Sequence, residues 1–163
     1  MPSIQRLTEV DTHAFRDIRL EGLRLYPSAF GADYEDERVQ PDAWFRARVI
    51  DHAVFGAFLD DGTLAGVAGL MIPSGAKMKH KGTLWGMYVR PVARGTGLAA
   101  ALVLQVVEYA KERVEELVLH CSPDNAAAIR LYEAAGFSVY ATEPRALKVD
   151  GVYFDSLLME KRF

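Results

Sequence analysis

The sequence predicts an α/β (α+β) fold, in which a mixed central sheet of about seven strands is flanked by helices. Strand-like and helix-like segments follow one another in the order β, α, α, β, β, β, α, β, α, β, β. The early strands have short connections and should pair antiparallel, whereas the strand–helix–strand unit of residues 84–120 should be parallel. A mixed sheet with helices on its faces accommodates both kinds of pairing.

The N-terminal segment predicts one strand and one helix. Residues 3–7 alternate apolar and polar side chains, which is typical of a short strand. The helix that follows has Thr8 or Asp11 as its capping residue. Pro27 ends this helix, because proline disfavours helical geometry in the residue before it. The apolar stripe expected to face the core is Ala14, Phe15, Ile18 and Leu25.

The middle of the chain predicts an acidic loop, a short helix and three strands. The loop covers residues 28–40, and Pro41 begins the helix. The strands are residues 53–59, 63–71 and 83–89. The first two form a hairpin, because residues 60–62 (D-D-G) are typical of a tight turn. A loop at residues 72–82 precedes the third strand.

The remainder predicts two helices and three strands. The first helix runs from about residue 97 to residue 113, and a second, capped by Asp124 or Ser122, stops at Gly136. The buried stripe of the first helix is Leu98, Leu102, Val103, Val106, Val107 and Ala110. The strands are residues 117–120, 137–142 and 152–159.

Composition limits the classes of function. The 163 residues suffice for one domain with a sizeable core, and we expect residues 1–163 to form it. A net charge of −3 argues against a general nucleic-acid-binding protein, which needs a basic face. No apolar run reaches the roughly 18 residues of a membrane span, and no signal-peptide pattern is present. Because Cys121 is the single cysteine, no internal disulfide can form, which fits a cytoplasmic location.

Residues 94–99 (R-G-T-G-L-A) join a strand to a helix and predict an anion site. Glycines let backbone N–H groups gather, and the first N–H groups of a helix have no intrahelical partner. With the Arg94 guanidinium, this arrangement suits a phosphate or pyrophosphate. A P-loop is excluded, because no Gly-Lys-Ser/Thr follows. A dinucleotide-binding loop would be followed by an acidic residue at the end of the next strand, and this sequence has none there. A structural turn with no ligand remains an alternative interpretation.

Two segments together resemble the GNAT superfamily of N-acetyltransferases. Residues 94–99 match its Q/R-x-x-G-x-G/A signature. Residues 125–137 match its N-x-x-A-x-x-x-Y-x-x-x-G-F segment at every specified position. The segments lie about one helix and one strand apart, as in that family. The resemblance implies the same fold and direct transfer of an acetyl group from acetyl-CoA to an amine in a ternary complex.

The resemblance also implies which residues bind acetyl-CoA. Its pyrophosphate would lie on the backbone N–H groups of Arg94, Gly95, Thr96, Gly97, Leu98 and Ala99. The preceding strand would bulge, so that the backbone of Met87, Tyr88 and Val89 pairs with the pantetheine arm. Asn125 would hydrogen-bond the pantetheine, cap its own helix, or do both.

The resemblance assigns the catalytic acid more directly than the base. Tyr132 matches the tyrosine that protonates the departing thiolate, and a core tyrosine is the alternative. Many relatives carry a glutamate on the strand before the loop, where residues 83–89 (T-L-W-G-M-Y-V) have no carboxylate. The candidate bases are Glu35, Glu37, His120 and Asp155. We favour His120, because imidazole titrates nearest pH 7. Cys121 is expected to be an inert buried thiol.

The acceptor and the partners are the least determined. In the resembling family the first helices and the last strands wall the acceptor pocket, which makes Phe30, Tyr34, Trp44 and Tyr153 candidates. The acceptor would be an amine of a small molecule or a protein. No metal, nucleic acid or membrane partner is expected, and a homodimer is left open. The missing strand carboxylate also motivates an alternative function, a non-catalytic acyl-CoA-binding sensor or scaffold.

Overall fold

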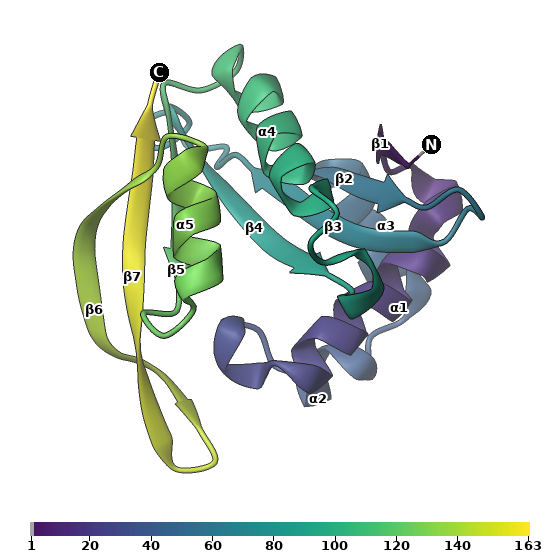
Figure 1. Ribbon diagram of the computed structural model, residues 1–163, viewed down its shortest axis with the longest axis horizontal. Coiled ribbons are helices and arrows are strands. Elements are labelled where there is room, and N and C mark those ends of the chain that lie inside the picture. The colour runs from purple at the N-terminus through teal and green to yellow at the C-terminus, as the bar shows by residue number, and fades with distance from the viewer. Residues whose placement is uncertain (1) are drawn as a thin grey trace.

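The computed structural model describes residues 2–163 and confirms a mixed sheet flanked by helices (Figure 1). The strands are β1 (Ser3–Arg6), β2 (Ala53–Phe58), β3 (Leu64–Met71), β4 (Lys81–Val89), β5 (Glu116–Cys121), β6 (Ser138–Val149) and β7 (Val152–Arg162). The α-helices are α1 (Thr12–Leu25), α2 (Tyr34–Arg38), α3 (Asp42–Asp51), α4 (Leu98–Lys111) and α5 (Ala126–Ala134). Short 3₁₀ helices are η1 (Glu9–Asp11), η2 (Pro27–Ala29) and η3 (Pro91–Ala93).

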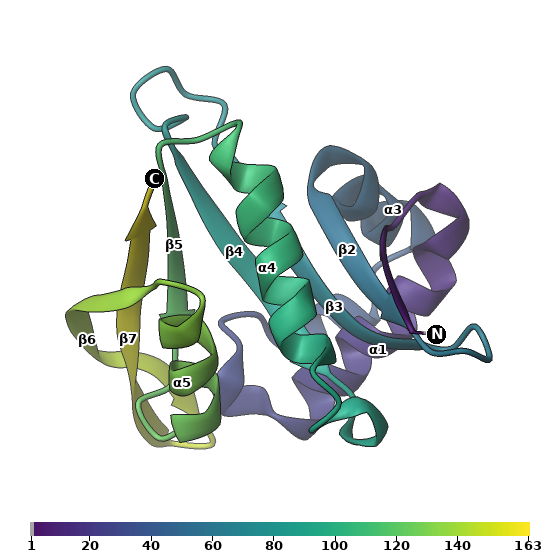
Figure 2. The same cartoon turned by 45° about the horizontal axis from the view of Figure 1, so that its top comes forward.

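The strands lie in the order β1-β2-β3-β4-β5-β7-β6. The early strands pair antiparallel and β4 pairs parallel with β5, as predicted. The parallel pairing is short: Lys81–Thr83 lies opposite Glu116–Val118, although β4 continues to Val89 and β5 to Cys121. Beyond these pairs the two strands diverge (Figure 2). The sheet is therefore open at its centre.

Helices cover both faces of the sheet, so the protein has two apolar layers. Helices α4 and α5 lie on one face of the sheet (Figure 2). They cover an apolar cluster that includes Phe55, Leu70 and Leu117. On the other face α1 and α3 bury a second cluster that includes Phe15 and Phe45. Strands β2 and β3 are buried almost throughout because both of their faces are covered.

The buried face of α4 is the one predicted from the sequence. Its buried residues are Leu98, Leu102, Val103, Val106, Val107 and Ala110. The helix starts immediately after Gly97. Leu102 packs so closely on β3 that a Cβ at Gly66 would lie 2.8 Å from the Leu102 Cδ1 atom. The helix is thereby held against the centre of the sheet, with its N-terminus at the end of β4.

The stripe predicted for α1 is correct at Phe15 and Ile18 but wrong at Leu25, which is 47 % exposed. Leu25 is the last residue of α1, and helical phase does not explain its exposure, because Leu23 lies about as far around the helix from Phe15 and is buried. Gly22 and Leu23 are buried instead. A Cβ at Gly22 would lie 3.1 Å from the Tyr88 ring, so the helix approaches β4 closely at this point.

Two predicted boundaries are wrong. Residues 28–40 are not a loop throughout, because they contain η2 and α2. A helix of only five residues is too short to show a hydrophobic period. The strand predicted to end at residue 142 continues as β6 to Val149. Most of β6 is exposed, so it lacks the alternation of apolar and polar residues that would have revealed it.

The second helix of the C-terminal half is capped by Asn125 rather than by Asp124 or Ser122. The Ala128 N–H donates to Asn125 Oδ1 at 3.0 Å. Gly136 has a φ of +98° and ends the helix as predicted. Among residues 2–163 there is no helix with both the length and the apolar character needed to cross a membrane.

Replacing Leu102 by alanine tests the packing of α4. Leu102 is fully buried, so Leu102→Ala should lower the free energy of unfolding by about 2–5 kcal/mol. Leu104 lies on the same helix and is 55 % exposed, so Leu104→Ala should change the free energy of unfolding by less than about 1 kcal/mol. Urea unfolding followed by circular dichroism measures both. Equal losses in the two variants would contradict this account of the core.

Candidate active site

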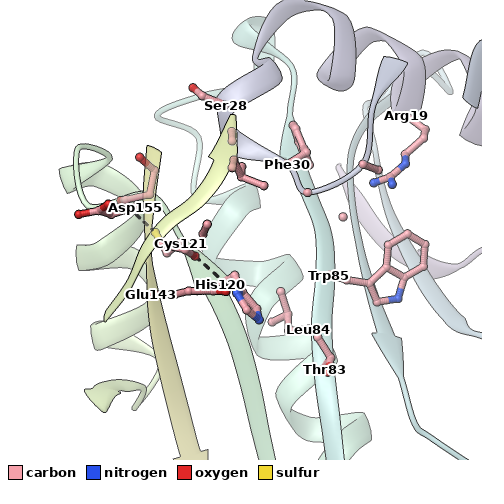
Figure 3. A pocket seen from close by; sticks show the side chains of 18 residues that line it. Arg19, Ser28, Phe30, Thr83, Leu84, Trp85, His120, Cys121, Glu143 and Asp155 are labelled. Atoms are coloured by element: carbon pink, nitrogen blue, oxygen red, sulfur yellow. Dashed lines mark hydrogen bonds between the residues drawn. The ribbon is translucent and has the colours of Figure 1, made fainter. Parts of the chain in front are cut away.

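Two cavities lie where β4 and β5 diverge. The loop-side cavity, of about 500 Å³, is lined by residues of β4, α4 and α5. The hairpin-side cavity, of about 420 Å³, is lined by residues of β4, the chain after α1, and the β6–β7 hairpin (Figure 3). Both are lined by Ala29, Phe30, His120, Cys121 and Ser122. Because they share this wall, the two cavities are the two ends of one cleft.

A β-bulge in β4 shapes the cleft. Val67 pairs with Tyr88 and Gly69 pairs with Trp85, so β4 has one more residue than β3 over this interval. Gly86 lies in the bulge with a φ of +66°, a conformation that favours glycine. The bulge predicted for this strand is therefore confirmed.

The glycine loop presents unpaired backbone donors beside the loop-side cavity. Gly95 and Gly97 have φ values of +74° and +87°, so both need the left-handed conformation. Within residues 2–163, the N–H groups of Gly95, Gly97 and Ala99 have no hydrogen-bond partner. The Leu98 N–H is 3.4 Å from Thr96 Oγ1. These donors, at the N-terminus of a 14-residue helix, form a site suited to an anion.

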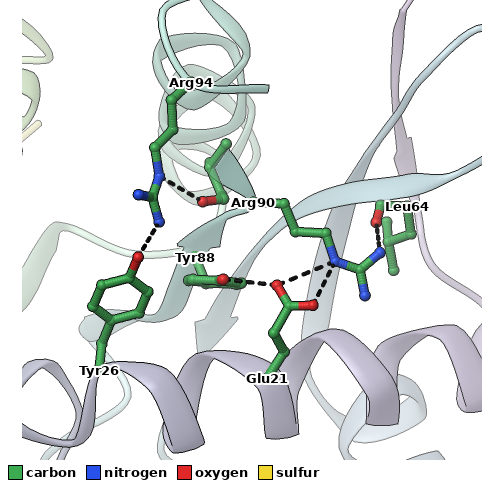
Figure 4. A network of polar contacts seen from close by, with 7 residues as sticks. Glu21, Tyr26, Leu64, Tyr88, Arg90 and Arg94 are labelled. Atoms are coloured by element: carbon green, nitrogen blue, oxygen red, sulfur yellow. Dashed lines mark hydrogen bonds and ion pairs between the residues drawn. The ribbon is translucent and has the colours of Figure 1, made fainter. Parts of the chain in front are cut away.

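Arg94 connects the glycine loop with the end of α1 (Figure 4). Its Nε donates to the Val89 carbonyl at 3.1 Å, and its Nη2 donates to the Tyr26 hydroxyl at 3.0 Å. The guanidinium carbon also lies 5.3 Å from the Tyr26 ring centroid. The Arg94 side chain thus joins Val89 to Tyr26, and all three residues line the loop-side cavity.

Glu21 connects α1 with the end of β4 (Figure 4). The Tyr88 hydroxyl donates to Glu21 Oε2 at 2.7 Å, and Arg90 Nε donates to Glu21 Oε1 at 3.1 Å. Arg90 also donates to the Leu64 carbonyl at 2.8 Å. Burial, followed by the hydrogen bond to the Glu21 carboxylate, raises the pKa of Tyr88 to about 12. This network fixes the strand segment that follows the bulge.

Tyr132 and Asn125 lie on the wall of the loop-side cavity formed by α5. Tyr132 is buried and packs edge-to-face on Phe137, with ring centroids 6.0 Å apart. Burial raises its pKa well above the ordinary value. Its hydroxyl has no hydrogen-bond partner among residues 2–163, which leaves the O–H free to donate to a molecule in the cavity.

His120 stands where the two cavities meet, near the end of β5. Its side chain is exposed, and its Nδ1 lies 3.4 Å from the Ser156 hydroxyl of β7. The neighbouring Cys121 is buried, and burial raises the pKa of its thiol. His120 therefore reaches the cleft as a polar group, whereas Cys121 stays a protonated thiol.

A comparison with protein families assigns most of the chain to one family. Residues 19–137 match the family described as "Acetyltransferase (GNAT) family". The chain belongs to this family. The match includes the bulged strand, the glycine loop and the Asn125–Phe137 segment, and it ends before the β6–β7 hairpin.

Two curated relatives are similar to most of this chain but are much longer. The mycothiol acetyltransferase of Beutenbergia cavernae is 30 % identical over 138 residues, which is 82 % of this chain and 43 % of the relative. The mycothiol acetyltransferase of Thermobispora bispora is 28 % identical over 137 residues, again 82 % of this chain and 45 % of the relative. The chain thus spans less than half the length of these relatives.

Solved structures share the fold over the whole chain. A GNAT-family acetyltransferase from Streptococcus pneumoniae superposes with a TM-score of 0.88 at 20 % identity, covering 100 % of both chains. The ribosomal-protein-alanine N-acetyltransferase of Brucella melitensis gives 0.82 at 26 % identity, over 99 % of each chain. The Salmonella typhimurium protein yncA, solved with its cofactor acetyl-CoA, gives 0.82 at 23 % identity, covering 99 % of this chain and 94 % of that one.

The structure of this GNAT member brings most of the predicted cofactor residues to one cavity. The loop-side cavity is lined by Met87, Tyr88, Val89, Arg94, Ala99, Asn125 and Tyr132. Gly95, Thr96, Gly97 and Leu98 complete the adjoining loop between η3 and the first turn of α4. Their role in binding acetyl-CoA stays a prediction, which the geometry accommodates.

Only one of the four residues predicted to bind the acceptor lines the cleft. Phe30 lines both cavities, but Tyr34, Trp44 and Tyr153 line neither. Trp44 packs edge-to-face on Phe45, with centroids 4.9 Å apart, in the apolar layer beneath α3. Tyr153 is 46 % exposed, beneath the guanidinium of Arg145. Aromatic spacing along the chain did not distinguish a cleft wall from these packing positions.

Two candidate bases are held away from the cleft. Both carboxylate oxygens of the buried Glu37 accept hydrogen bonds from Arg19, at 3.0 and 2.9 Å. Glu35 is exposed and pairs with Arg38. Among the four candidates only His120 and Asp155 line the cleft. The structure adds Arg19, Trp85 and Glu143 to the cleft wall, which no sequence motif marked.

The Tyr88–Glu21 contact predicts a pH dependence of stability. The folded state keeps the phenol protonated to about pH 12, whereas an unfolded tyrosine ionises near pH 10. Stability should therefore be full below about pH 10 and fall by at most about 3 kcal/mol as the pH rises to about 12. Tyr88→Phe should flatten this fall in urea unfolding measured against pH. An unchanged slope in the variant would show that Tyr88 does not cause it.

Proposed function

We propose that the protein is an acetyl-CoA-dependent N-acetyltransferase that moves an acetyl group to a primary amine of a small molecule or a protein by direct transfer. One observation carries the proposal: a single cleft joins an anion site at the glycine loop to a second cavity, and His120 stands at the junction. Family membership supports the same reaction class.

The loop-side cavity fits the donor. The free N–H groups of Gly95, Gly97 and Ala99 would hold the pyrophosphate of acetyl-CoA. The bulged segment Met87–Val89 has no β5 partner, so its backbone could pair with the pantetheine arm. When bound, acetyl-CoA supplies the acetyl group as a thioester. Yet Arg94 must exchange its bonds to Val89 and Tyr26 if it is to bind phosphate oxygens.

Direct transfer suits this cleft better than a covalent acyl-enzyme. A covalent mechanism needs a nucleophilic side chain to accept the acetyl group, and Cys121 is the candidate for that role. Burial, however, raises the pKa of its thiol. A thiol that stays protonated is a poor nucleophile. The amine itself would therefore attack the thioester carbonyl, forming the N–C bond as the C–S bond breaks.

Two of the proton transfers in this reaction can be assigned to side chains of the cleft. His120 would take a proton from the acceptor ammonium, with Ser156 orienting its ring through Nδ1. Tyr132 would donate its phenolic proton toward the departing thiolate from the α5 side of the loop-side cavity. The nitrogen loses its second proton to solvent as the amide forms, and the Tyr132 phenolate regains a proton from water. Burial raises its pKa, which keeps the phenol protonated between turnovers.

The proposal includes both small-molecule and protein amines as acceptors. The curated relatives are mycothiol acetyltransferases, whereas one structural neighbour is a ribosomal-protein-alanine N-acetyltransferase. The first name points to a small molecule and the second to a protein. Both kinds of acceptor are therefore included in the proposal.

Arg94 offers a direct test of the donor site. Arg94→Ala should weaken acetyl-CoA binding about tenfold in calorimetry, because a forked cation that can reach phosphate oxygens is lost. Arg46 is exposed on α3, on the other face of the sheet, and Arg46→Ala should bind like the wild type. No binding of acetyl-CoA to the wild type would refute the proposed function.

Tyr132→Phe tests the proton donor. The substitution removes only the hydroxyl, so kcat for amine acetylation should fall about 100-fold while KM for acetyl-CoA changes less than about threefold. The exposed Tyr140 of β6 provides the control, and Tyr140→Phe should leave kcat unchanged. An unchanged kcat in Tyr132→Phe would remove Tyr132 as the acid. Binding of acetyl-CoA without turnover on any amine would instead support the sensor alternative.

A further inference from the structure

This inference rests on the proposed function, the acetylation of amines. The charges around the hairpin-side cavity indicate which amines the cavity favours. We propose that this cavity selects amines that carry a second positive charge, and that Glu143 of β6 supplies the opposite charge. Figure 3 shows Glu143 and Asp155 on one side of the cavity and Arg19 with Trp85 on the other. His120 lies between these two sides (Figure 3).

Arg19 is the one guanidinium that lines this cavity in the described chain, and its charge is already balanced. Its Nε and Nη2 donate to the two oxygens of Glu37 at 3.0 and 2.9 Å. Both side chains are about nine-tenths buried, with exposed fractions of 10 % and 9 %. Such a two-point pair is rigid and close to neutral when seen from the cavity. The charge of Arg19 is therefore largely offset by Glu37, and only the N–H groups of Nη1, beside Gly86, remain as donors to a carboxylate on the acceptor.

The aromatic surroundings of Arg19 strengthen this conclusion. The guanidinium carbon lies 5.4 Å from the Trp85 ring centroid and 5.9 Å from that of Phe30, and both rings line the cavity. This side therefore presents flat apolar surface and a compensated cation. A chain of methylene groups would pack well against it.

Glu143 is different, because nothing in the described chain balances its charge. Its side chain is exposed on the cavity wall, and the carboxylate has no ion pair or hydrogen bond among residues 2–163. Pro144 follows it, which biases the Glu143 backbone toward the extended conformation. The carboxylate is thus available to a ligand in the cavity.

An unusual backbone holds Glu143 in place. The pairing shifts between Glu143, opposite Ser156, and Leu147, opposite Phe154, so β6 contains a bulge. Arg145 in this bulge has a φ of +52°, a conformation that is costly for a residue with a Cβ. The Arg145 N–H donates to Asp155 Oδ1 at 2.9 Å, which anchors the bulge to β7. Asp155 is therefore a positioning residue that also adds negative charge to this wall.

These charges distinguish acceptors that are otherwise alike. The amine that attacks must lose its proton to react, but a second amine stays protonated near neutral pH. That second ammonium would lie close to Glu143 and gain a favourable interaction in a partly desolvated cleft. A carboxylate in the same place would meet two negative side chains without a compensating cation. The expected order is diamine, then monoamine, then amino acid.

A series of amines with four-carbon chains tests this order with the wild-type enzyme and acetyl-CoA. We expect kcat/KM for 1,4-diaminobutane to exceed that for 1-aminobutane at least about tenfold, and 4-aminobutanoate to be the poorest. Acetylation of amines without this order would refute the charge selection and leave the proposed function intact. Acetylation of no amine in a broad panel would refute the proposed function itself.

Variants at position 143 assign the preference to Glu143. Glu143→Gln should reduce kcat/KM for the diamine about tenfold while that for 1-aminobutane changes less than about twofold. Glu143→Lys should reverse the order of the diamine and 4-aminobutanoate. Glu108→Gln, the same charge change on the exposed face of α4, should change neither. Equal losses for the diamine and the monoamine would instead indicate a general structural role and overturn the proposal, as would an unaltered preference in both variants.

Discussion

The site depends on one constraint, the early separation of the two parallel strands β4 and β5. They pair only through Lys81–Thr83 and Glu116–Val118, and beyond this point the Gly86 bulge turns β4 away. The edge of β4 that pairs with β5 at Lys81–Thr83 then has no neighbouring strand, whereas the other edge still pairs with β3. Backbone groups must find partners, so this separation creates a cleft whose wall favours a ligand able to form hydrogen bonds. Both cavities follow from it.

Packing on the two faces of the sheet keeps the strands apart. On one face α4 is anchored over β3 by Leu102, which brings the glycine loop to the end of β4. On the other face Glu21 ties α1 to Tyr88 and Arg90. The cleft is thus held open by packing and hydrogen bonds within the protein, which makes it a preformed site.

Local patterns were sufficient for the elements with strong periodicity. The buried residues of α4, the hairpin of β2 and β3, and the helix end at Gly136 agree with prediction because each depends on residues close in sequence. The same reasoning missed α2, which is short, and most of β6, which is exposed. It also placed Leu25 in the core, although this last residue of α1 is exposed.

By itself the sequence determined the fold class, the glycine loop and the helix bearing Tyr132, since these arise from contiguous segments with a local physical cause. Only the tertiary structure decided which polar groups meet in the cleft. It put His120 beside Ser156, neutralised Arg19 with the distant Glu37, and left Glu143 without a partner on the cavity wall. Those relations join residues far apart in the chain, and charge balance depends on distance in space, which no spacing along the sequence records.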